Sequence, residues 1–177
     1  IDWNAREFHG YTTEQGITYN AYLILDEKIT LIDTVKYTMT DELIERIQSI
    51  VDPTKIDVVV CNHIEMDHSS SLPAILEVAP NAAVYASAPQ GVKEIKAFYG
   101  EDLEVNGVKT GDTLSIGKRT LHFVQTPMVH WPDNMVTYSD VDKILFSNDA
   151  FGQHYASSTR FDDESDAFQI QDNLLIS

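Results

Sequence analysis

A short polar segment gathers residue types that bind metal ions. In CNHIEMDHSSSLP, which starts at Cys61, two imidazoles and two carboxylates fall within six positions: His63, Glu65, Asp67 and His68. In an extended segment His63 and Glu65 project to the same side, and the other two side chains lie in the following turn. Mixed nitrogen and oxygen donors suit a borderline or hard divalent metal. The alternative is a polar turn whose carboxylates cap the next helix and whose histidines are satisfied locally.

Two more potential ligands each follow a predicted strand. His130 lies in TPMVHWPDN, after a strand predicted at Thr120–Gln125, and Asp149 lies in LFSNDAFGQH, after a strand predicted at Ile144–Ser147. Taken singly, a histidine beside Trp131 is typical of a packed loop, and an aspartate after a strand is typical of a turn. The first cluster also follows a strand, and strand-end loops commonly carry the sites of α/β folds. We therefore expect the three loops to meet.

The elements that must position these side chains follow from apolar patterning and turn signals. Three helices with serine or threonine N-caps are predicted, at Thr40–Ile50, at Leu72–Val78 after Ser69 and Ser70, and from Ser87 to about Gly100. Strands are predicted at Tyr19–Leu25, Thr30–Asp33, Ile56–Cys61, Ala83–Ala86, Thr113–Ile116, Thr120–Gln125, Met135–Tyr138 and Ile144–Ser147. The first two strands form a hairpin, and the continuous apolar run IDVVVC indicates a strand buried on both faces. Alternating strands and helices followed by a β-meander predict a mixed α/β layered domain.

Length and composition predict one domain that spans residues 1–177, because 177 residues with 43% hydrophobic content can bury a core. A net charge of −16 with only 12 Lys and Arg argues against binding to nucleic acid or to an anionic membrane surface. The single cysteine, Cys61, excludes an internal disulfide and a cysteine-based metal centre within this chain. No apolar stretch reaches the roughly 20 residues that cross a bilayer. We expect a reducing, cytoplasmic setting.

The ligand series and its flanking segments resemble those of the flavodiiron proteins. The pattern H-x-E-x-D-H is followed by a histidine 62 positions after His68 and by an aspartate 19 positions further on. The segments IDWNAREFHGYT, TYNAYLI, LIDTVK, HWPDNMV and FSNDAFGQHYAS look like the same family, so the resemblance extends to about Arg160. It implies a metallo-β-lactamase-like αββα sandwich, incomplete on its C-terminal side. Hydrolases of that superfamily typically show H-x-H-x-D-H, and Glu65 stands in place of their second histidine.

The resemblance implies a pair of iron ions. The side chains that match the family's ligand positions are His63, Glu65 and His130 at one iron, Asp67 and His68 at the other, and Asp149 bridging the two. His68 matches either as a ligand or as a group beside the second iron. A carboxylate at Glu65 makes the site harder and more anionic, which suits iron that cycles between ferrous and ferric states.

Two further residues match the surroundings of the family's metal site. His9, in REFHGY, matches a histidine that lines the substrate pocket and donates a proton or a hydrogen bond; the alternative is a surface histidine in a turn. Trp131 is expected to pack beside His130 and to limit water access, with plain core packing as the alternative.

The resemblance also implies parts and partners beyond this sequence. The family's last ligand, a histidine about sixty positions after the bridging aspartate, and its FMN-binding flavodoxin-like domain have no counterpart here, so we expect a fragment of a longer protein. That protein would reduce dioxygen to water or nitric oxide to nitrous oxide with electrons from FMN. A rubredoxin-like or flavin donor and a head-to-tail homodimer are expected of it.

Two other functions stay open at this point. A metal-dependent hydrolase on the same fold would use zinc to activate water. A non-catalytic, truncated module would bind no metal. Glu65 and the family-like flanks favour the oxidoreductase.

Overall fold

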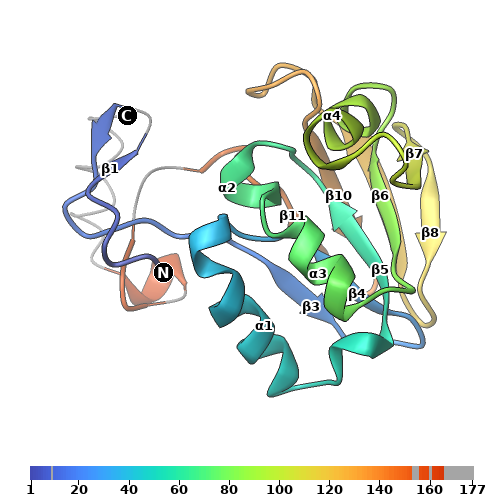
Figure 1. The fold of residues 1–177 in the computed structure, drawn as a ribbon, viewed down its shortest axis with the longest axis horizontal. Coiled ribbons are helices and arrows are strands. Elements are labelled where there is room, and N and C mark those ends of the chain that lie inside the picture. Colours follow the sequence, from blue (N-terminus) through green and yellow to red (C-terminus); the bar gives the residue numbers. More distant parts are fainter. Residues whose placement is uncertain (9, 153–155, 160, 166–177) are drawn as a thin grey trace. The chain divides into compact units, whose positions relative to one another are not determined.

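The computed structural model describes residues 1–8, 10–152, 156–159 and 161–165, and the chain forms two compact units (Figure 1). The smaller unit combines residues 1–19 with the residues from Phe151 onward. Its described elements are an antiparallel ribbon of β1 (Glu7–Phe8) and β2 (Tyr11–Thr12), and a short 3₁₀ helix at Asp162–Glu164. The larger unit, Asn20–Ala150, contains the remaining elements.

A five-stranded sheet is the main element of the larger unit. Its strands are, in spatial order, β3 (Tyr22–Ile24), β4 (Ile29–Ile32), β5 (Ile56–Cys61), β6 (Ala83–Ser87) and β7 (Val105–Val108). β3 and β4 form the predicted antiparallel hairpin, and β4 to β7 run parallel. Every residue of β5 except Asp57 is buried, which confirms the reading of its apolar run. Because parallel strands end at one edge, the loops that follow them gather there.

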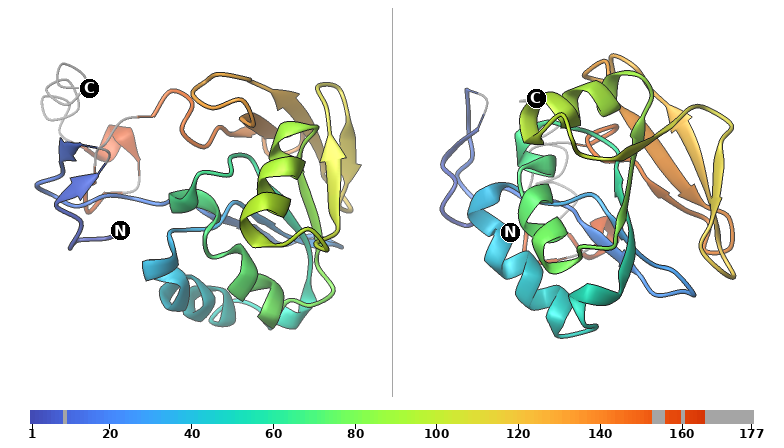
Figure 2. Two further views of the ribbon diagram at one scale, coloured as in Figure 1. Left: turned by 45° about the horizontal axis from the view of Figure 1, so that its top comes forward. Right: turned by 45° about the vertical axis from the view of Figure 1, so that its right-hand side comes forward.

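Helices cover one face of this sheet, as Figure 2 shows. They are α1 (Thr40–Gln48), α2 (Met66–Ser69), α3 (Leu72–Val78) and α4 (Gln90–Tyr99), with 3₁₀ turns at Tyr37–Met39 and Pro53–Lys55. α1 is amphipathic: Leu43 and Ile47 are buried, whereas Asp41 and Glu45 are exposed. No helix in the described part of the chain has the length and apolar character that crossing a membrane requires.

A four-stranded antiparallel sheet packs on the other face of the five-stranded sheet (Figure 2). Its strands are, in spatial order, β11 (Ile144–Phe146), β10 (Met135–Ser139), β9 (Thr120–Gln125) and β8 (Thr113–Ser115). The core between the sheets consists of Ile24, Ile32, Val58, Val60, Val108, Ile116, Leu121, Phe123, Met135 and Phe146. These layers confirm the predicted mixed α/β class.

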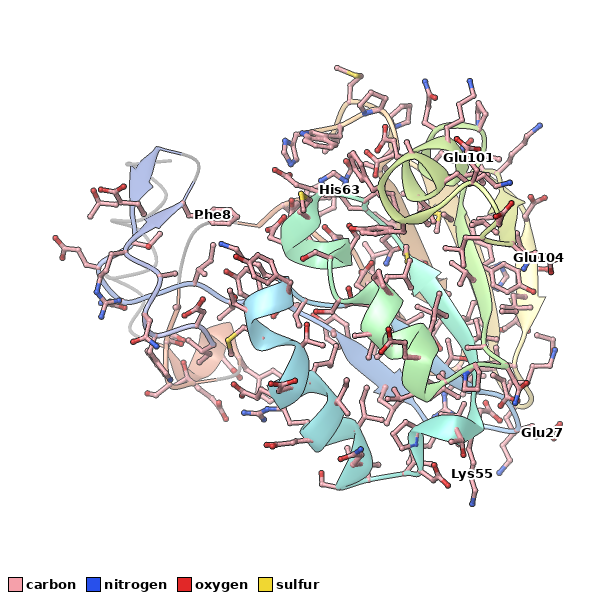
Figure 3. The ribbon with its side chains drawn as sticks, viewed as in Figure 1. Phe8, Glu27, Lys55, His63, Glu101 and Glu104 are labelled. Carbon is pink, nitrogen blue, oxygen red and sulfur yellow. The ribbon has the colours of Figure 1, made fainter. Side chains whose placement is uncertain are left out.

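The edge at which the parallel strands end carries the predicted ligands. Figure 3 shows His63 at this edge, where α2 begins, and Glu27 and Lys55 at the opposite edge. Lys55 directly precedes β5 and His63 follows it, so the two labels mark the two ends of that strand.

The first helix ends earlier than predicted, and its N-cap is a different residue. Met39, which closes a 3₁₀ turn, is the N-cap of α1, and Thr40 is the first helical residue, its hydroxyl donating to the Tyr37 carbonyl. The helix ends at Gln48, and Ile50 is 60% exposed, outside the apolar stripe predicted to include it. The prediction of Thr40 as N-cap is wrong because the 3₁₀ turn at Tyr37–Met39 runs directly into α1, so Thr40 is already helical.

The serine caps predicted for the next two helices are also wrong. An extra helical turn, α2, comes first: the Ser69 hydroxyl donates to the Ile64 and Glu65 carbonyls, and Ser70 is the C-cap of α2. α3 starts at Leu72 as predicted, without a side-chain cap. Pro89 takes the N-cap position of α4, although the Ser87 hydroxyl still accepts the Gly91 N–H.

Strand β7 is not among the strands predicted from the sequence, and it contains Gly107. A Cβ at Gly107 would lie 2.8 Å from the Ala88 Cβ, so the glycine permits close packing inside a strand.

Phe123→Ala is expected to destabilise the larger unit by about 3–5 kcal/mol, because it leaves a cavity between the sheets. Phe123 is 1% exposed and its ring stacks near that of Tyr85. Val124, on the same strand, is 41% exposed and supplies a matched control, Val124→Ala, which should cost less than about 1 kcal/mol. Urea unfolding followed by circular dichroism measures both losses. Equal losses would contradict a core between the two sheets.

Candidate metal centre

Four of the predicted ligands lie in the turn after β5 and in the helix α2 that follows it. His63 follows the last residue of β5 by two positions and is fully buried. Glu65 is the N-cap of α2, and its carbonyl accepts the N–H of His68 at 2.9 Å. Asp67 and His68 lie within α2 and are 8% and 7% exposed. A helical turn thus replaces the loop expected from the sequence, and it holds two ligand candidates nearly buried.

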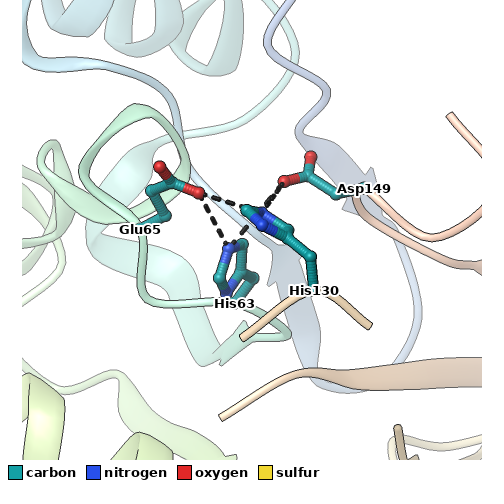
Figure 4. Close-up of side chains that lie close together, drawn as sticks. All are labelled: His63, Glu65, His130 and Asp149. Carbon is teal, nitrogen blue, oxygen red and sulfur yellow. Dashed lines mark hydrogen bonds and ion pairs between the residues drawn. The ribbon is translucent and has the colours of Figure 1, made fainter. Parts of the chain in front are cut away.

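Four side chains from three loops form a first donor group: His63, Glu65, His130 and Asp149 (Figure 4). One ligand atom of each lies within 4.8 Å of those of the others. Glu65 Oε2 lies 3.2 Å from His63 Nε2 and 3.1 Å from His130 Nε2. Asp149 Oδ2 lies 3.3 Å from His130 Nε2 and 3.8 Å from His63 Nε2. The loops that follow β5, β9 and β11 therefore meet at one place.

Asp67, His68 and Asp149 form a second donor group. His68 Nε2 lies 3.0 Å from Asp67 Oδ2 and 2.8 Å from Asp149 Oδ1. Among the described residues, no partner makes an aligned hydrogen bond with either buried ring nitrogen of His68 or with Asp67 Oδ1. Asp149 contributes Oδ1 to this group and Oδ2 to the first, so one carboxylate faces both.

The electrostatics of the two groups favour positive charge at the histidines. Burial acts to lower the pKa of His63, but hydrogen bonds to the carboxylates of Asp133 and Glu65 outweigh it and raise this pKa to about 9. Burial likewise opposes charge on His68, and the two carboxylates of its donor group raise its pKa to about 10. For Asp149 burial acts to raise the pKa, but His68 and the other histidines lower it on balance. The carboxylates stabilise positive charge here, whether a proton or a metal ion carries it.

Buried hydrogen bonds beneath the site fix the strand end that carries it. Asp33 Oδ1 accepts the Asn62 N–H at 2.7 Å, and its Oδ2 accepts the Asn62 side-chain amide at 3.0 Å. The amide oxygen of Asn62 accepts the Thr137 hydroxyl at 2.7 Å, which ties β10 to the same point. Thr34 donates both its N–H and its hydroxyl to the His68 carbonyl. Sequence analysis missed these residues, although Asp33 and Asn62 directly follow strands, as the predicted ligands do.

Trp131 borders the first donor group. Its ring centroid lies 5.4 Å from that of His63 and 6.2 Å from that of His130. His9, predicted to line the substrate pocket, lies outside the described residues.

The fold and site define a metallo-β-lactamase-like domain: helices and two facing sheets, with histidines and carboxylates at the strand ends. The profile of the ODP family beta lactamase matches residues 17–171, and the chain belongs to this family. A nitric oxide reductase from Moorella thermoacetica is 48% identical over 175 residues, which cover 97% of this chain and 44% of the relative. A rubredoxin-oxygen oxidoreductase from Megalodesulfovibrio gigas is 49% identical over 166 residues, 93% of this chain and 41% of the relative.

Solved structures give the same relationship. Rubredoxin oxygen:oxidoreductase from Desulfovibrio gigas matches with a TM-score of 0.93 and 46% identity, over 98% of this chain and 44% of that one. The flavodiiron protein from Giardia intestinalis matches with a TM-score of 0.92 and 44% identity, over 98% of this chain and 42% of that protein's chain. These matches confirm the resemblance to flavodiiron proteins. The chain spans less than half the length of the relatives it matches.

Without a bound metal, the larger unit is expected to lose stability as the pH rises from about 6.5 to about 10. The pKa values of His63 and His68 in the folded state, about 9 and about 10, lie above the unfolded value of 6.5, so the folded state binds more protons in this window. Their contribution is fully present below the unfolded pKa and is lost as the pH passes through the folded values. Urea unfolding of metal-stripped protein at several pH values measures this fall.

The same series on two variants supplies the control. His68→Gln should flatten the fall, whereas His122→Ala, at a side chain that is 43% exposed on β9, should preserve it. A stability that does not change between pH 6.5 and 10 would contradict the assignment of proton binding to these histidines.

Proposed function

We propose that this chain is the metal-binding domain of a flavodiiron oxidoreductase and holds two iron ions. The observation that carries the proposal is the position of Asp149 between the two donor groups. Its Oδ1 lies 2.8 Å from His68 Nε2, and its Oδ2 lies 3.3 Å from His130 Nε2. A carboxylate with one oxygen toward each donor group is suited to bridge two cations.

The donors present fit such a pair of cations. The ligands we propose are His63, Glu65 and His130 for one iron, Asp67 and His68 for the other, and Asp149 between them. Buried polar atoms normally have hydrogen-bond partners, and an unpartnered one costs free energy. Asp67 Oδ1 has no partner among the described residues, and His68 Nε2 makes no aligned hydrogen bond with the carboxylates beside it, as is expected of atoms that would bind a cation.

The balance of donors favours iron over zinc. Three carboxylates and three imidazoles make a harder and more anionic site than the histidine-rich one of the zinc hydrolases. Glu65 matters most, because one oxygen of its side chain contacts both His63 and His130.

The bound irons would supply the binding and reduction of dioxygen to water or of nitric oxide to nitrous oxide, with electrons from FMN. The chain's own side chains would hold the metals and control access. The His130 side chain is 51% exposed and that of Asp149 is 32% exposed, so the first donor group can be reached from solvent on this side. The ring of Trp131 contacts the His63 side, where water is excluded.

The relatives support the proposed substrates and partners. Their names, nitric oxide reductase and rubredoxin-oxygen oxidoreductase, correspond to the two substrates and to a rubredoxin-like donor. In the whole protein we expect an FMN-binding domain and a head-to-tail homodimer in the cytoplasm. His9 would contribute to the substrate pocket.

Anaerobic reconstitution with ferrous iron is expected to load two irons per chain. His130→Ala should weaken binding at the first donor group and leave about one tightly bound iron, because it removes one ligand of the proposed set. His122→Ala removes another partly exposed histidine, far along β9 from the loop, and should still load two. Iron analysis and Mössbauer spectroscopy measure the stoichiometry and the coupling.

Three outcomes would contradict the proposal. Zinc at both positions with esterase or lactamase turnover would favour a hydrolase, and no metal uptake would favour a non-catalytic module. If His130→Ala and His122→Ala load the same amount of iron, His130 is not a ligand.

A further inference from the structure

Asp133 lies behind His63, on the side away from the donor groups. It is 1% exposed and belongs to the loop between β9 and β10. Its Oδ2 accepts the backbone N–H of Ile64 at 2.7 Å and lies 2.9 Å from His63 Nδ1. Since a carboxylate only accepts, Nδ1 must carry the hydrogen of this bond.

This bond decides which His63 nitrogen faces the donor groups. With Nδ1 used by Asp133, Nε2 is the nitrogen that lies 3.2 Å from Glu65 Oε2. A carboxylate behind a ligating histidine fixes the ring orientation and makes the free nitrogen a stronger donor. Because Oδ2 also holds the Ile64 N–H, the ring and the backbone of this segment are set by one oxygen.

The other carboxylate oxygen of Asp133, Oδ1, is related to Glu94 of helix α4. Asp133 Oδ1 and Glu94 Oε2 are both buried, and among the described residues no donor is aligned to either. The two side chains interact: burial first, and then the negative charge of Asp133, raise the pKa of Glu94. Glu94 is half-buried as a residue, but its Oε2 is buried like Asp133 Oδ1, and two such carboxylate oxygens are stable close together when one proton lies between them.

Ser87, the last residue of β6, links the backbone of Asp133 to the start of α4. The Ser87 hydroxyl donates to the Asp133 carbonyl and accepts the Gly91 N–H. A Cβ at Gly91 would lie 2.8 Å from Ser87 Oγ, so glycine is what permits this close approach. Glu94 lies about one turn after Gly91, so the contact of Ser87 with Gly91 places the start of α4, and with it Glu94, beside Asp133.

We propose that Asp133 is the positioning residue of His63, and that Glu94 supports it by donating a hydrogen bond from a protonated carboxyl group to Asp133 Oδ1. This rests on the proposed function in so far as His63 is an iron ligand. Helix α4 thereby contributes to the metal site although none of its side chains belongs to a donor group.

Ferrous titration of the whole chain and its variants under anaerobic conditions tests the proposal. Asp133→Ala is expected to weaken iron binding by about 10- to 100-fold, the range typical of groups that orient a ligating histidine. Glu94→Gln keeps a hydrogen-bond donor at the same place and should bind iron like the wild type. Glu94→Leu keeps the size but removes the donor, and should weaken binding by about 10-fold.

Glu101, exposed on the turn after α4, supplies the matched control for the loss of one charge. Glu101→Leu and Glu101→Gln should both bind iron like the wild type. If Glu94→Gln and Glu94→Leu weaken binding equally, Glu94 acts through its charge and the proposed donation is wrong. If the folded Asp133→Ala variant binds ferrous iron as tightly as the wild type, Asp133 does not position His63 for metal binding.

A metal-free measurement separates this inference from the proposed function. In ¹H–¹⁵N spectra of metal-free protein, the Nδ1–H proton of His63 should exchange slowly with water in the wild type and in Glu94→Gln. It should exchange faster in Glu94→Leu, and fastest in Asp133→Ala. A wild type that binds no iron would contradict the function, whereas fast exchange in the wild type would contradict the inference alone.

Discussion

One carboxylate, that of Asp149, contacts all three histidines of the site, and the larger unit is arranged so that these contacts form. Its oxygens lie 2.8 Å from His68, 3.3 Å from His130 and 3.8 Å from His63. The topology explains how. β9 and β11 are both antiparallel to β10, so they run the same way and end at the same edge of their sheet. The core between the sheets aligns that edge with the end of β5, and the three loops meet there because three strands end there.

The polar groups of Asp33, Asn62 and Thr137 below the site are paired, whereas Asp67 Oδ1 and the ring nitrogens of His68 make no aligned hydrogen bond among the described residues. The Asp33 carboxylate, the Asn62 amide and the Thr137 hydroxyl satisfy one another in a buried chain of hydrogen bonds. Fully satisfied networks of this kind are rigid, because breaking any bond leaves a buried group without a partner. In His68 the buried ring nitrogens have no aligned partner among the described residues. The hydrogen bonds of Asp33, Asn62 and Thr137 therefore hold the strand end in place, while Asp67 Oδ1 and His68 beside Asp149 keep the capacity to bind a cation.

Sequence patterns predicted most strands and the loops that carry the site, because burial imposes a readable apolar pattern. They failed where a preceding turn or a contact distant in sequence decides the role of a residue. β7 was not predicted, because its Gly107 is unusual in a strand and serves the close packing of Ala88. Thr40 was read as a cap, but a 3₁₀ turn precedes it. Asp133 contacts a histidine seventy positions earlier, and neither its spacing nor its type reveals this. The ligand candidates were accessible because their residue types are unusual together; the residues that orient them are ordinary turn and strand-end residues.

The choice of Glu65 has a consequence for charge. In the proposed diiron centre two ferrous ions bring four positive charges, and the carboxylates Glu65, Asp67 and Asp149 bring three negative ones. An imidazole at position 65 would leave two carboxylates and a larger uncompensated positive charge. Oxidation to the ferric state adds positive charge, so the more anionic ligand set stabilises the oxidised metals relative to the reduced ones. The side chain is well placed to do this, since Oε2 contacts both His63 and His130. In the proposed centre the third carboxylate would therefore favour iron that loses and regains electrons over a divalent ion that only activates water.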